Sequence, residues 1–271
     1  MDLQRSPLLT VLMRVYNAED HVHEAIRSVL LQGFVDFELL IVEGASSDRS
    51  GEIVRSFSDY RIRIVPQTGL GKNDALACGL AAARGLYLAI QDADDLSLPN
   101  RFARQVSALN GDADMVIVGS WVSIIEKRGA EIGVRTYPLD DAAIRRAMAL
   151  YNPFAHSAVM FRLAPARACG GYTDTQVLED YDFYPRLLAY GTCANLPEVL
   201  TAYRLHTYAT AQHVKFILKA TLDTKWKMHT VYGYRWTFRS VAVFCSQWLM
   251  QLLPSRVVNV LFRIIFIKRR R

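Results

Sequence analysis

The chain has 271 residues, of which 51% are apolar and 21% charged, and its net charge is +6. This composition excludes a disordered or fibrous protein, and the length suits one large α/β domain with an appendage, or two modest domains. The four cysteines, Cys78, Cys169, Cys193 and Cys245, lie far apart without a CxxC pair. Their spacing argues against a zinc ribbon and against a disulfide framework, so we expect a reducing compartment.

The charge is distributed unevenly along the chain. Residues 201–271 hold 13 Lys and Arg and one acid, whereas the first 200 residues have a net charge of −6. A basic tail on an acidic body predicts a polyanionic partner or an anionic membrane. The N-terminal residues lack the basic segment, long apolar run and cleavage site of a signal peptide, so we expect a cytoplasmic protein.

Strands and helices alternate in the first half of the chain. Apolar runs predict the strands, and the segments between them have apolar residues at helical spacing. The predicted strands are 8–17, 61–66 and 87–91, together with 37–50, a strand that runs into a turn rich in Gly and Ser. The predicted helices are 19–32, 49–57 and 71–85, the last closed by Gly85. Alternation at βαβ spacing predicts a parallel sheet covered on both faces, with ligands at the carboxyl ends of its strands.

The second half of the chain is less regular. Its pattern predicts a strand at 113–125, a helix at 139–151 and a strand at 156–162. A loop with Gly170 and Gly171 follows, and then a helix from about Glu179. Beyond about residue 208 the chain becomes basic and helical.

Three carboxylates, Asp92, Asp94 and Asp95, directly follow the apolar strand "YLAIQ". An Asp-x-Asp pair at the end of a strand suits a hard divalent cation such as Mg²⁺ or Mn²⁺, which keeps waters and takes phosphate oxygens. The alternative is that one of them caps a helix beginning about Pro99. Capping needs one carboxylate rather than three, so the pattern favours a metal site.

Two further carboxylates, Glu43 and Asp48, lie on the loop after the strand 37–43. A carboxylate there suits a hydrogen bond from a base imide or from a ribose hydroxyl. Asp48 is also well placed to cap the helix 49–57, and that structural interpretation is favoured for it. Glu43 ends an apolar strand and has no such structural explanation.

The segment "LEDYDF" places Glu179, Asp180 and Asp182 at a predicted helix start, where the helix dipole favours acids in any protein. The functional interpretation requires one of these carboxylates to reach the metal cavity and take a proton from an acceptor hydroxyl. Two histidines, His156 and His206, lie beside predicted strands. Each is either a structural residue or, for His206, a contact to a metal or a phosphate.

Five segments occur in the order typical of family 2 glycosyltransferases with the GT-A fold. They are "TVLMRVYNAEDHVHEAIRSVLLQGFVDFELLIVEGASSD", "GKNDALACGLAAARGLYLAIQDADD", "NPFAHSAVMFR", "LEDYDFYPRL" and "YRLH". The chain resembles that family over about residues 7–208. The resemblance implies a nucleoside diphosphate-sugar donor, with a UDP-sugar favoured, a divalent cation (Mn²⁺ or Mg²⁺), and transfer with inversion at the anomeric carbon.

The resemblance also implies roles for individual residues. Asp180 matches the general base and Glu179 its partner, while Asp94 and Asp92 match the metal pair, with Asp92 nearer the ribose. The implied donor contacts are Tyr16, Glu43, Asp48, Lys72, Asp74 and Asp92; His206 is implied at the metal or diphosphate and His156 on the acceptor side. Gly44, Arg14 and Ala77 depart from the common pattern of the family, which bears on the identity of the donor.

The resemblance divides the chain into a catalytic domain and a tail. Residues 1–208 are expected to form the GT-A domain, with a nucleotide-sugar half (about 1–112) and an acceptor half (about 113–208). Residues 209–271 are expected to form a basic helical tail. The predicted fold class is therefore an α/β GT-A fold, a mostly parallel Rossmann-like sheet with helices on both faces, followed by amphipathic C-terminal helices.

The tail carries two apolar runs, 241–253 and 257–267, that are too short to span a bilayer. With Trp236, Trp248 and the terminal basic residues, they predict a helix lying in a membrane interface. A dimer helix, and hence a homodimer, or a helix covering the catalytic domain is the alternative. A nucleic-acid arm is disfavoured because such an arm would be basic without being this apolar.

We therefore expect an inverting sugar transferase, peripheral on the inner face of the cell membrane, that acts on a lipid-linked or polysaccharide acceptor. One alternative is a nucleotidyltransferase on a similar sheet, which would need a Gly-rich, basic triphosphate loop where the chain has "MRVYNAED". The other is a non-catalytic nucleotide-sugar-binding scaffold on the membrane. The intact Asp94 and Asp180 argue against that scaffold.

Overall fold

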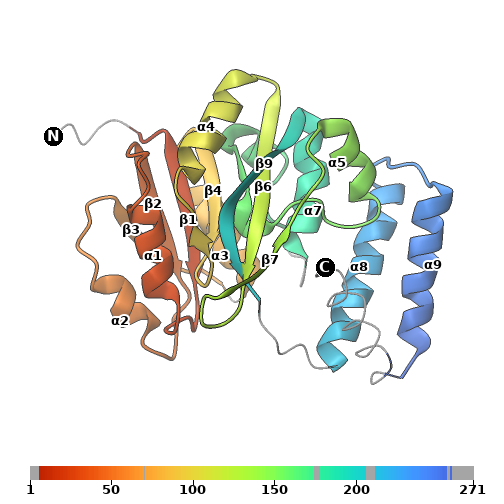
Figure 1. Ribbon diagram of the computed structural model, residues 1–271, viewed down its shortest axis with the longest axis horizontal. Helices are drawn as coiled ribbons and strands as arrows, with labels where there is room; N and C mark the ends of the chain where they lie inside the picture. The colour runs from red at the N-terminus through yellow and green to blue at the C-terminus, as the bar shows by residue number, and fades with distance from the viewer. Residues whose placement is uncertain (1–5, 70, 174–177, 206–210, 255–256, 258–271) are drawn as a thin grey trace.

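The computed structural model describes residues 6–69, 71–173, 178–205, 211–254 and 257 (Figure 1). The strands are β1 (Leu9–Val15), β2 (Phe37–Glu43), β3 (Ile62–Pro66), β4 (Tyr87–Asp92), β5 (Leu96–Ser97), β6 (Met115–Ile125), β7 (Glu131–Arg135), β8 (Met160–Arg162) and β9 (Thr192–Arg204). The helices are α1 (Val22–Leu30), α2 (Ser50–Arg55), α3 (Lys72–Ala82), α4 (Arg101–Gly111), α5 (Asp141–Met148), α6 (Leu163–Ala168), α7 (Glu179–Leu187), α8 (Ala211–Thr230) and α9 (Phe238–Leu252), with 3₁₀ turns η1 (His156–Ala158) and η2 (Leu188–Tyr190).

One sheet runs through the molecule in the order β3-β2-β1-β4-β8-β6-β9-β5, with β7 beside β6. Strands β1 to β4 are parallel, as the alternation of strands and helices predicts. Strand β8 is antiparallel to both β4 and β6, and β9 returns parallel to β6. The α/β class is confirmed, and the sheet is parallel where strands and helices alternate strictly.

Two local predictions are wrong. Residues His156–Ala158 form η1 rather than the start of a strand, because the backbone N–H of Ala158 donates to Ala155 O at 3.0 Å. Helix α3 ends at Ala82 rather than at Gly85. Gly85 has a different reason to be glycine: a Cβ there would lie 2.5 Å from the backbone nitrogen of Thr10 on β1.

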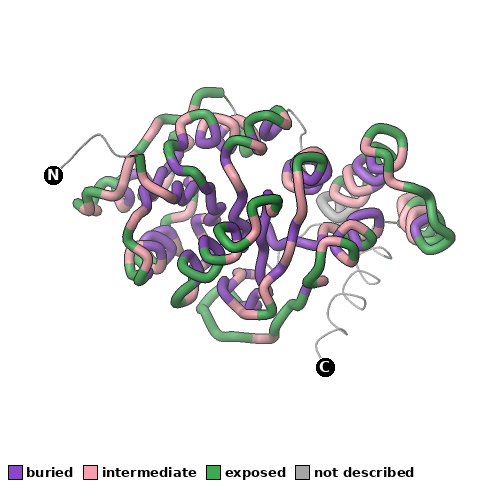
Figure 2. Tube along the Cα trace, turned by 90° about the horizontal axis from the view of Figure 1, so that it is seen from above, coloured by how far each residue is buried: buried purple, intermediate pink, exposed green. Residues whose placement is uncertain are grey.

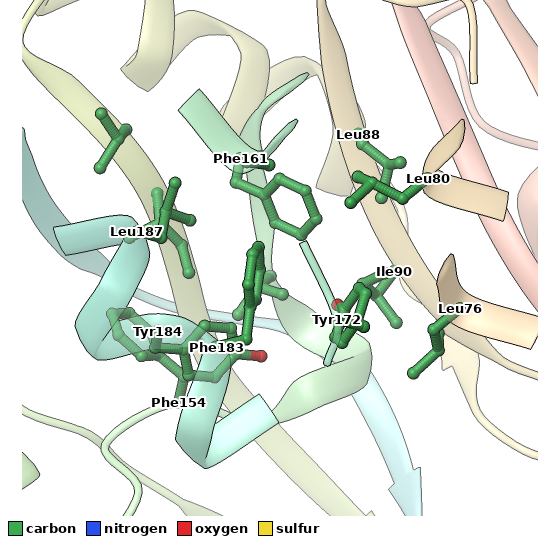
Figure 3. Packing of buried hydrophobic residues seen from close by; sticks show 14 of the residues in the cluster. Leu76, Leu80, Leu88, Ile90, Phe154, Phe161, Tyr172, Phe183, Tyr184 and Leu187 are labelled. Carbon is green, nitrogen blue, oxygen red and sulfur yellow. The ribbon is translucent and has the colours of Figure 1, made fainter. Parts of the chain in front are cut away.

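Apolar side chains fill both faces of the sheet. On one face, alternate residues of β1 and β2 pack with α1 and α4, as Leu9, Val11 and Phe102 show. On the other face, Leu12 and Leu40 pack with α3, α5 and α7. Figure 3 shows Phe183 and Tyr184 of α7 against Phe161 and Phe154, at ring-centroid distances of 5.3 and 5.2 Å respectively. This aromatic packing fixes the helix that begins with Glu179 and Asp180.

The register of the parallel strands aligns the ends that matter for function. Val15 pairs with Glu43, and Arg14 pairs with Asp92. Tyr16, Glu43 and Asp92 therefore lie at the same edge of the sheet, although the chain separates them by dozens of residues. Loops that follow β1, β2 and β4 meet at this carboxyl edge, where open α/β sheets bind their ligands.

Helices α8 and α9 form a hairpin at the end of the molecule beyond α7 (Figure 1). Met228 of α8 is fully buried in the core that holds α7, and Tyr232 and Tyr234 pack against the same core. Helix α9 is mostly exposed, as the outermost helix of Figure 2 shows. Among the helices of the described ranges, none is both long and apolar enough to cross a membrane. The second predicted apolar run, 257–267, falls outside the described residues except for Val257.

Candidate active site

The loops after β1 and β2 hold each other at the carboxyl edge. The side-chain oxygen of Asn17 accepts from the backbone N–H of Ser47 at 2.9 Å, and the Ser46 hydroxyl accepts from the backbone N–H of Asn17 at 3.2 Å. Glu43 Oε1 accepts from the backbone N–H of Ser46 at 2.9 Å. Tyr16 remains 54% exposed at the surface of this loop pair. Glu43 and Tyr16 thus lie on a rigid rim, with an aromatic face open to a ligand.

Asp48 belongs to the structure of this rim. Its Oδ1 accepts from the backbone N–H of Ser50, the first residue of α2, at 2.9 Å. Its Oδ2 accepts from the backbone N–H of Glu19 at 3.1 Å. These bonds agree with the capping interpretation of Asp48 and tie the two loops together.

Gly44 leaves space for the side chain of Gln67, a residue that the sequence analysis did not identify. A Cβ at Gly44 would lie 2.7 Å from Gln67 Oε1, so a larger residue there requires Gln67 to move. The Gln67 amide donates to Gly71 O at 2.7 Å. Gln67, from the loop after β3, therefore occupies the space that a second acidic side chain after Glu43 would fill. The Asp74 carboxylate lies against Gly69 of the same loop, within 2.6 Å of the position that a Cβ would take.

Asp92, at the end of β4, lies in a field of positive charge. Burial alone would raise the pKa of its carboxyl, but Lys72, His156, Arg14 and Arg101 together lower it. Arg101 is completely buried and donates to Ile90 O at 2.7 Å and to Gln91 Oε1 at 3.0 Å. Arg14, a departure from the common family pattern, is the register partner of Asp92. The surroundings keep Asp92 ionised.

The three carboxylates after β4 have different tasks. Asp95 is 1% exposed, accepts from the backbone N–H of Arg204 at 2.7 Å and from the Ser157 hydroxyl, and burial raises its pKa well above the ordinary value. The backbone carbonyl of Asp94 accepts from Arg204 Nε at 2.7 Å. Asp95 therefore anchors the loop to β9 and η1, and Arg204 holds the backbone that carries Asp94. The capping alternative fails: Asn100, in the left-handed conformation, precedes α4, and the side chain that accepts from this helix start is Gln32, whose Oε1 accepts from the backbone N–H of Phe102 at 3.4 Å, rather than one of the three aspartates.

Glu179 and Asp180 begin α7 on the opposite side of the site. Glu179 Oε1 lies 2.5 Å from Lys72 Nζ at the start of α3. Burial would raise the pKa of Glu179, but Lys72 and His156 outweigh it and lower the pKa. Asp180 Oδ2 accepts from the Asn152 amide at 2.7 Å, and Oδ1 accepts from the backbone N–H of Tyr181 at 2.8 Å. Burial and the neighbouring Glu179 raise the pKa of Asp180 despite His156 and Lys72.

His156 lies between the two sets of carboxylates. Its Nδ1 is hydrogen-bonded to the Tyr184 hydroxyl at 3.0 Å, and its charge acts on Asp92, Glu179 and Asp180 alike. Within the described residues, two buried polar atoms here have no hydrogen-bond partner: His156 Nε2 and the Tyr172 hydroxyl. Their rings lie edge to face, with centroids 5.9 Å apart. Buried groups of this kind are rarely left unpaired in a native protein, so each requires a partner here, either an ordered water or a ligand.

The predicted metal ligands are Asp92, Asp94 and His206. His206 lies outside the described residues, and among those described no three His, Cys, Asp or Glu side chains lie together as a metal centre. Two carboxylates at a loop edge still fit Mg²⁺ or Mn²⁺, since such ions are commonly bound by one or two carboxylates together with substrate phosphates. The donor set therefore suits a cation that arrives with a diphosphate.

The structure brings Lys72, Asp92, Glu179, Asp180 and His156 together, from segments up to 108 residues apart in the chain. Asp48, on the loop after β2, and Asp74, in the first turn of α3, lie outside this group. Sequence reasoning missed Arg101, Asn152, Tyr172 and Arg204. Asn152 had a signal, because it opens the segment "NPFAHSAVMFR" that also carries His156.

Comparison with known proteins agrees with this geometry. The family model described as glycosyl transferase family 2 matches residues 10–164. An uncharacterized glycosyltransferase of Haemophilus influenzae is 31% identical over 77% of this chain and 69% of its own length. The O-antigen biosynthesis glycosyltransferase WbnJ of Escherichia coli is 30% identical over 78% of this chain and 84% of its own length. Among solved structures, a mannosyltransferase of Pyrobaculum calidifontis in complex with GDP-Man and Mn²⁺ has the same fold, with a TM-score of 0.62, 16% identity, and coverage of 97% of this chain and 81% of that one.

Proposed function

The chain belongs to glycosyl transferase family 2, and from that premise we propose that it moves a sugar from a nucleoside diphosphate to an acceptor hydroxyl with inversion at the anomeric carbon. The single observation that carries the mechanism is the contrast between Asp92 and Asp180. The pKa of Asp92 is lowered and that of Asp180 is raised, within one cluster of charged groups. A raised carboxyl pKa suits a general base, because efficient proton transfer favours a pKa nearer the working pH.

Asp180 is positioned for proton removal on the acceptor side. The Asn152 amide and the Tyr181 backbone N–H hold both of its oxygens and leave further lone pairs for an acceptor hydroxyl. As the acceptor oxygen forms its bond to the anomeric carbon, its proton passes to Asp180. The bond from that carbon to the diphosphate breaks on the opposite face, and the electron pair leaves with the nucleoside diphosphate.

The donor side supplies positive charge for that departure. Lys72 is paired with Glu179 and acts on Asp92, so an ammonium group stands beside the carboxylates that the donor would approach. A divalent cation held by Asp92 and Asp94 would neutralise charge that develops on the leaving diphosphate. Tyr16 offers an exposed ring to the base, and Glu43 an acceptor for an imide N–H. Uracil and thymine both carry such an imide, so the contact favours a pyrimidine nucleotide, and a UDP-sugar is the expected donor.

A panel of donors tests the proposal. The protein is heated with UDP-, GDP- and dTDP-sugars, each with and without Mn²⁺ or Mg²⁺, and the unfolding temperature is recorded. A donor at a hundredfold excess over its Kd stabilises the fold by about 2.7 kcal/mol, so the true donor will separate clearly from the rest. Glu43→Gln should reduce the thermal stabilisation that the best donor gives. Glu52→Gln, a change at an exposed position on α2, should not reduce it. A protein that no nucleoside diphosphate-sugar stabilises would contradict the proposal.

We also propose that the acceptor is a lipid-linked or polysaccharide glycan at the cytoplasmic face of a membrane. The named role of WbnJ in O-antigen biosynthesis supports a cell-surface glycan. Exposed Trp226, Trp248 and Leu249 on the α8–α9 hairpin support a membrane contact, because aromatic and aliphatic side chains enter the lipid interface. Flotation with phosphatidylglycerol vesicles checks this contact, and a full-length protein that stays at the bottom of the gradient would contradict it.

A further inference from the structure

A cavity of about 770 Å³ lies between α5, the C-terminal end of α7 and the segment that joins α8 to α9. In Figure 1 this place is where α5 stands beside the upper end of the hairpin. Its apolar lining includes Pro138, Ala147, Leu150 and Pro185. The cavity is separate from the donor loops after β1 and β2, none of whose residues line it.

Arginines dominate the charged lining of this cavity. Arg145, Arg146, Arg235 and Arg239 line it, and none of the described lining residues is acidic. Arg145 is already neutralised, because its Nε lies 2.8 Å from Asp141 Oδ2 and its Nη2 donates to Gly191 O at 2.6 Å. In the part of the chain that the structure describes, no ion pair involves Arg146, Arg235 or Arg239. Arg146, Arg235 and Arg239 are exposed and therefore offer three guanidinium groups at the wall of the cavity.

The cavity adjoins the two chain segments that hold the proposed general base. Tyr151 lines it, and the next residue, Asn152, donates to Asp180 at 2.7 Å. Pro185 lines it too, about 7.5 Å along the axis of α7 from Asp180. The cavity therefore borders both the segment that positions Asp180 and the helix that carries it.

We propose that this cavity binds the phosphate or diphosphate of a phosphorylated lipid that carries the acceptor sugar, with Arg146, Arg235 and Arg239 as its anchors. Guanidinium forks match phosphate oxygens in pairs, and the apolar walls accept the first carbons of the lipid. The exposed aromatic side chains of the hairpin, Trp236 among them, adjoin Arg235, so the lipid chain can continue into a membrane. This assignment rests on the proposed function, because it names the acceptor class of that same active site.

Direct binding of farnesyl phosphate tests the assignment without any donor. The triple variant Arg146→Gln, Arg235→Gln, Arg239→Gln is compared with a control of equal charge change, Arg27→Gln, Arg55→Gln, Arg84→Gln, whose residues are exposed and do not line the cavity. Charge-assisted hydrogen bonds contribute enough that Kd should rise at least about tenfold in the first variant. The control should stay within about twofold of the wild type. Equal binding by all three proteins, or no binding by the wild type, overturns the assignment.

Two further arms separate the sources of phosphate. Inorganic phosphate should bind more weakly than farnesyl phosphate, because it lacks the apolar chain; equal affinity overturns the lipid part of the assignment. If the triple variant loses binding to phosphatidylglycerol vesicles but keeps farnesyl phosphate, the cavity serves membrane headgroups and the assignment is wrong. Thermal stabilisation by the donor should be the same in wild type and triple variant. A failure of that donor signal in the wild type contradicts the proposed function, whereas the farnesyl phosphate result is scored independently of it.

Discussion

The carboxyl end of β4 and the first turn of α7 both present an aspartate to the same site, yet the two side chains have opposite electrostatics. Asp92 faces Lys72, Arg14 and Arg101, and its pKa falls. Asp180 has Glu179 beside it and only an amide and a backbone N–H as hydrogen-bond donors, and its pKa rises. The two regions thus differ in electrostatics, and our proposal assigns the proton acceptor to α7.

This difference teaches that the identity of a residue does not decide its chemistry. Asp92 ends a strand and Asp180 lies in the first turn of a helix, and both are partly buried. Burial raises the pKa of both, and Lys72 and His156 lower the pKa of both; what separates them is that Arg14 and Arg101 also act on Asp92, whereas Glu179 acts on Asp180. The same argument applies to Glu179, whose pKa falls because Lys72 reaches it from α3.

The largest expected effect is loss of turnover on the α7 side alone. Asp180→Asn should lower kcat on the order of 10²–10⁴-fold and leave donor affinity unchanged, because it removes a general base. In the wild type, activity should fall as the pH drops through the raised pKa of Asp180, and the variant should lack this acid limb. Steady-state kinetics over a pH series, together with donor titration, check both expectations.

Asp94→Asn is the matched change on the β4 side. It should abolish the cation dependence of donor binding and leave the fold intact, because the backbone carbonyl of Asp94, which accepts from Arg204 Nε at 2.7 Å, is kept in the variant. If both variants lose donor affinity equally, the division of labour between the two regions is wrong.

A smaller effect is expected where the hairpin holds α7. Asp182 accepts from Tyr232 at 2.8 Å and from Lys227 and Arg186 at 3.3 Å. Burial would raise the pKa of Asp182, but these partners lower it, so its stabilisation is present above pH 3.8 and disappears as pH falls through the lowered value. Asp182→Asn should therefore cost about 1.5–3 kcal/mol at pH 7 and progressively less below pH 3.8. Urea denaturation at several pH values measures this difference.

Asp223→Asn is the control for Asp182. It removes an exposed pair with Lys219 on the same helix, and such surface pairs contribute little to stability. An equal decrease in the free energy of unfolding in both variants would mean that the hydrogen bonds to Asp182 do not anchor α7.

The smallest expected effect concerns the lysine that links the two regions. Lys72→Met should raise the pKa of Asp92 and Glu179 and weaken donor binding about tenfold. The pH at which the donor binds most tightly should therefore move to a higher value. Lys72→Arg keeps the charge and should retain most of the affinity. Calorimetric titration of the donor from pH 5 to 8 distinguishes them. An identical loss of donor affinity in Lys72→Met and Lys72→Arg would indicate that the shape of the side chain, rather than its charge, matters.

Much of the nucleotide-sugar half could be predicted from the sequence. Apolar runs that end in Tyr16, Glu43 and Asp92 give parallel strands, and parallel strands bring their carboxyl ends to one edge whatever the loops do. In the second half of the chain, the prediction for His156–Ala158 was wrong, because a local 3₁₀ turn stands where a strand was predicted to start. The short strands β5 and β7 also carried too little apolar pattern to be predicted.

The residues alone determined the family, the edge of the sheet that carries the site, and the candidates Asp94, Glu179 and Asp180. Only the tertiary structure decided which carboxylates serve structure, as Asp95 does through Arg204, and which of them hold or release a proton. The reason is physical: a pKa depends on burial and on charges within a few ångströms, and Lys72 meets Glu179 across 107 residues of sequence. No local sequence pattern predicts the contact between Lys72 and Glu179, because this contact results from the packing of α3 and α7 on the same face of the sheet.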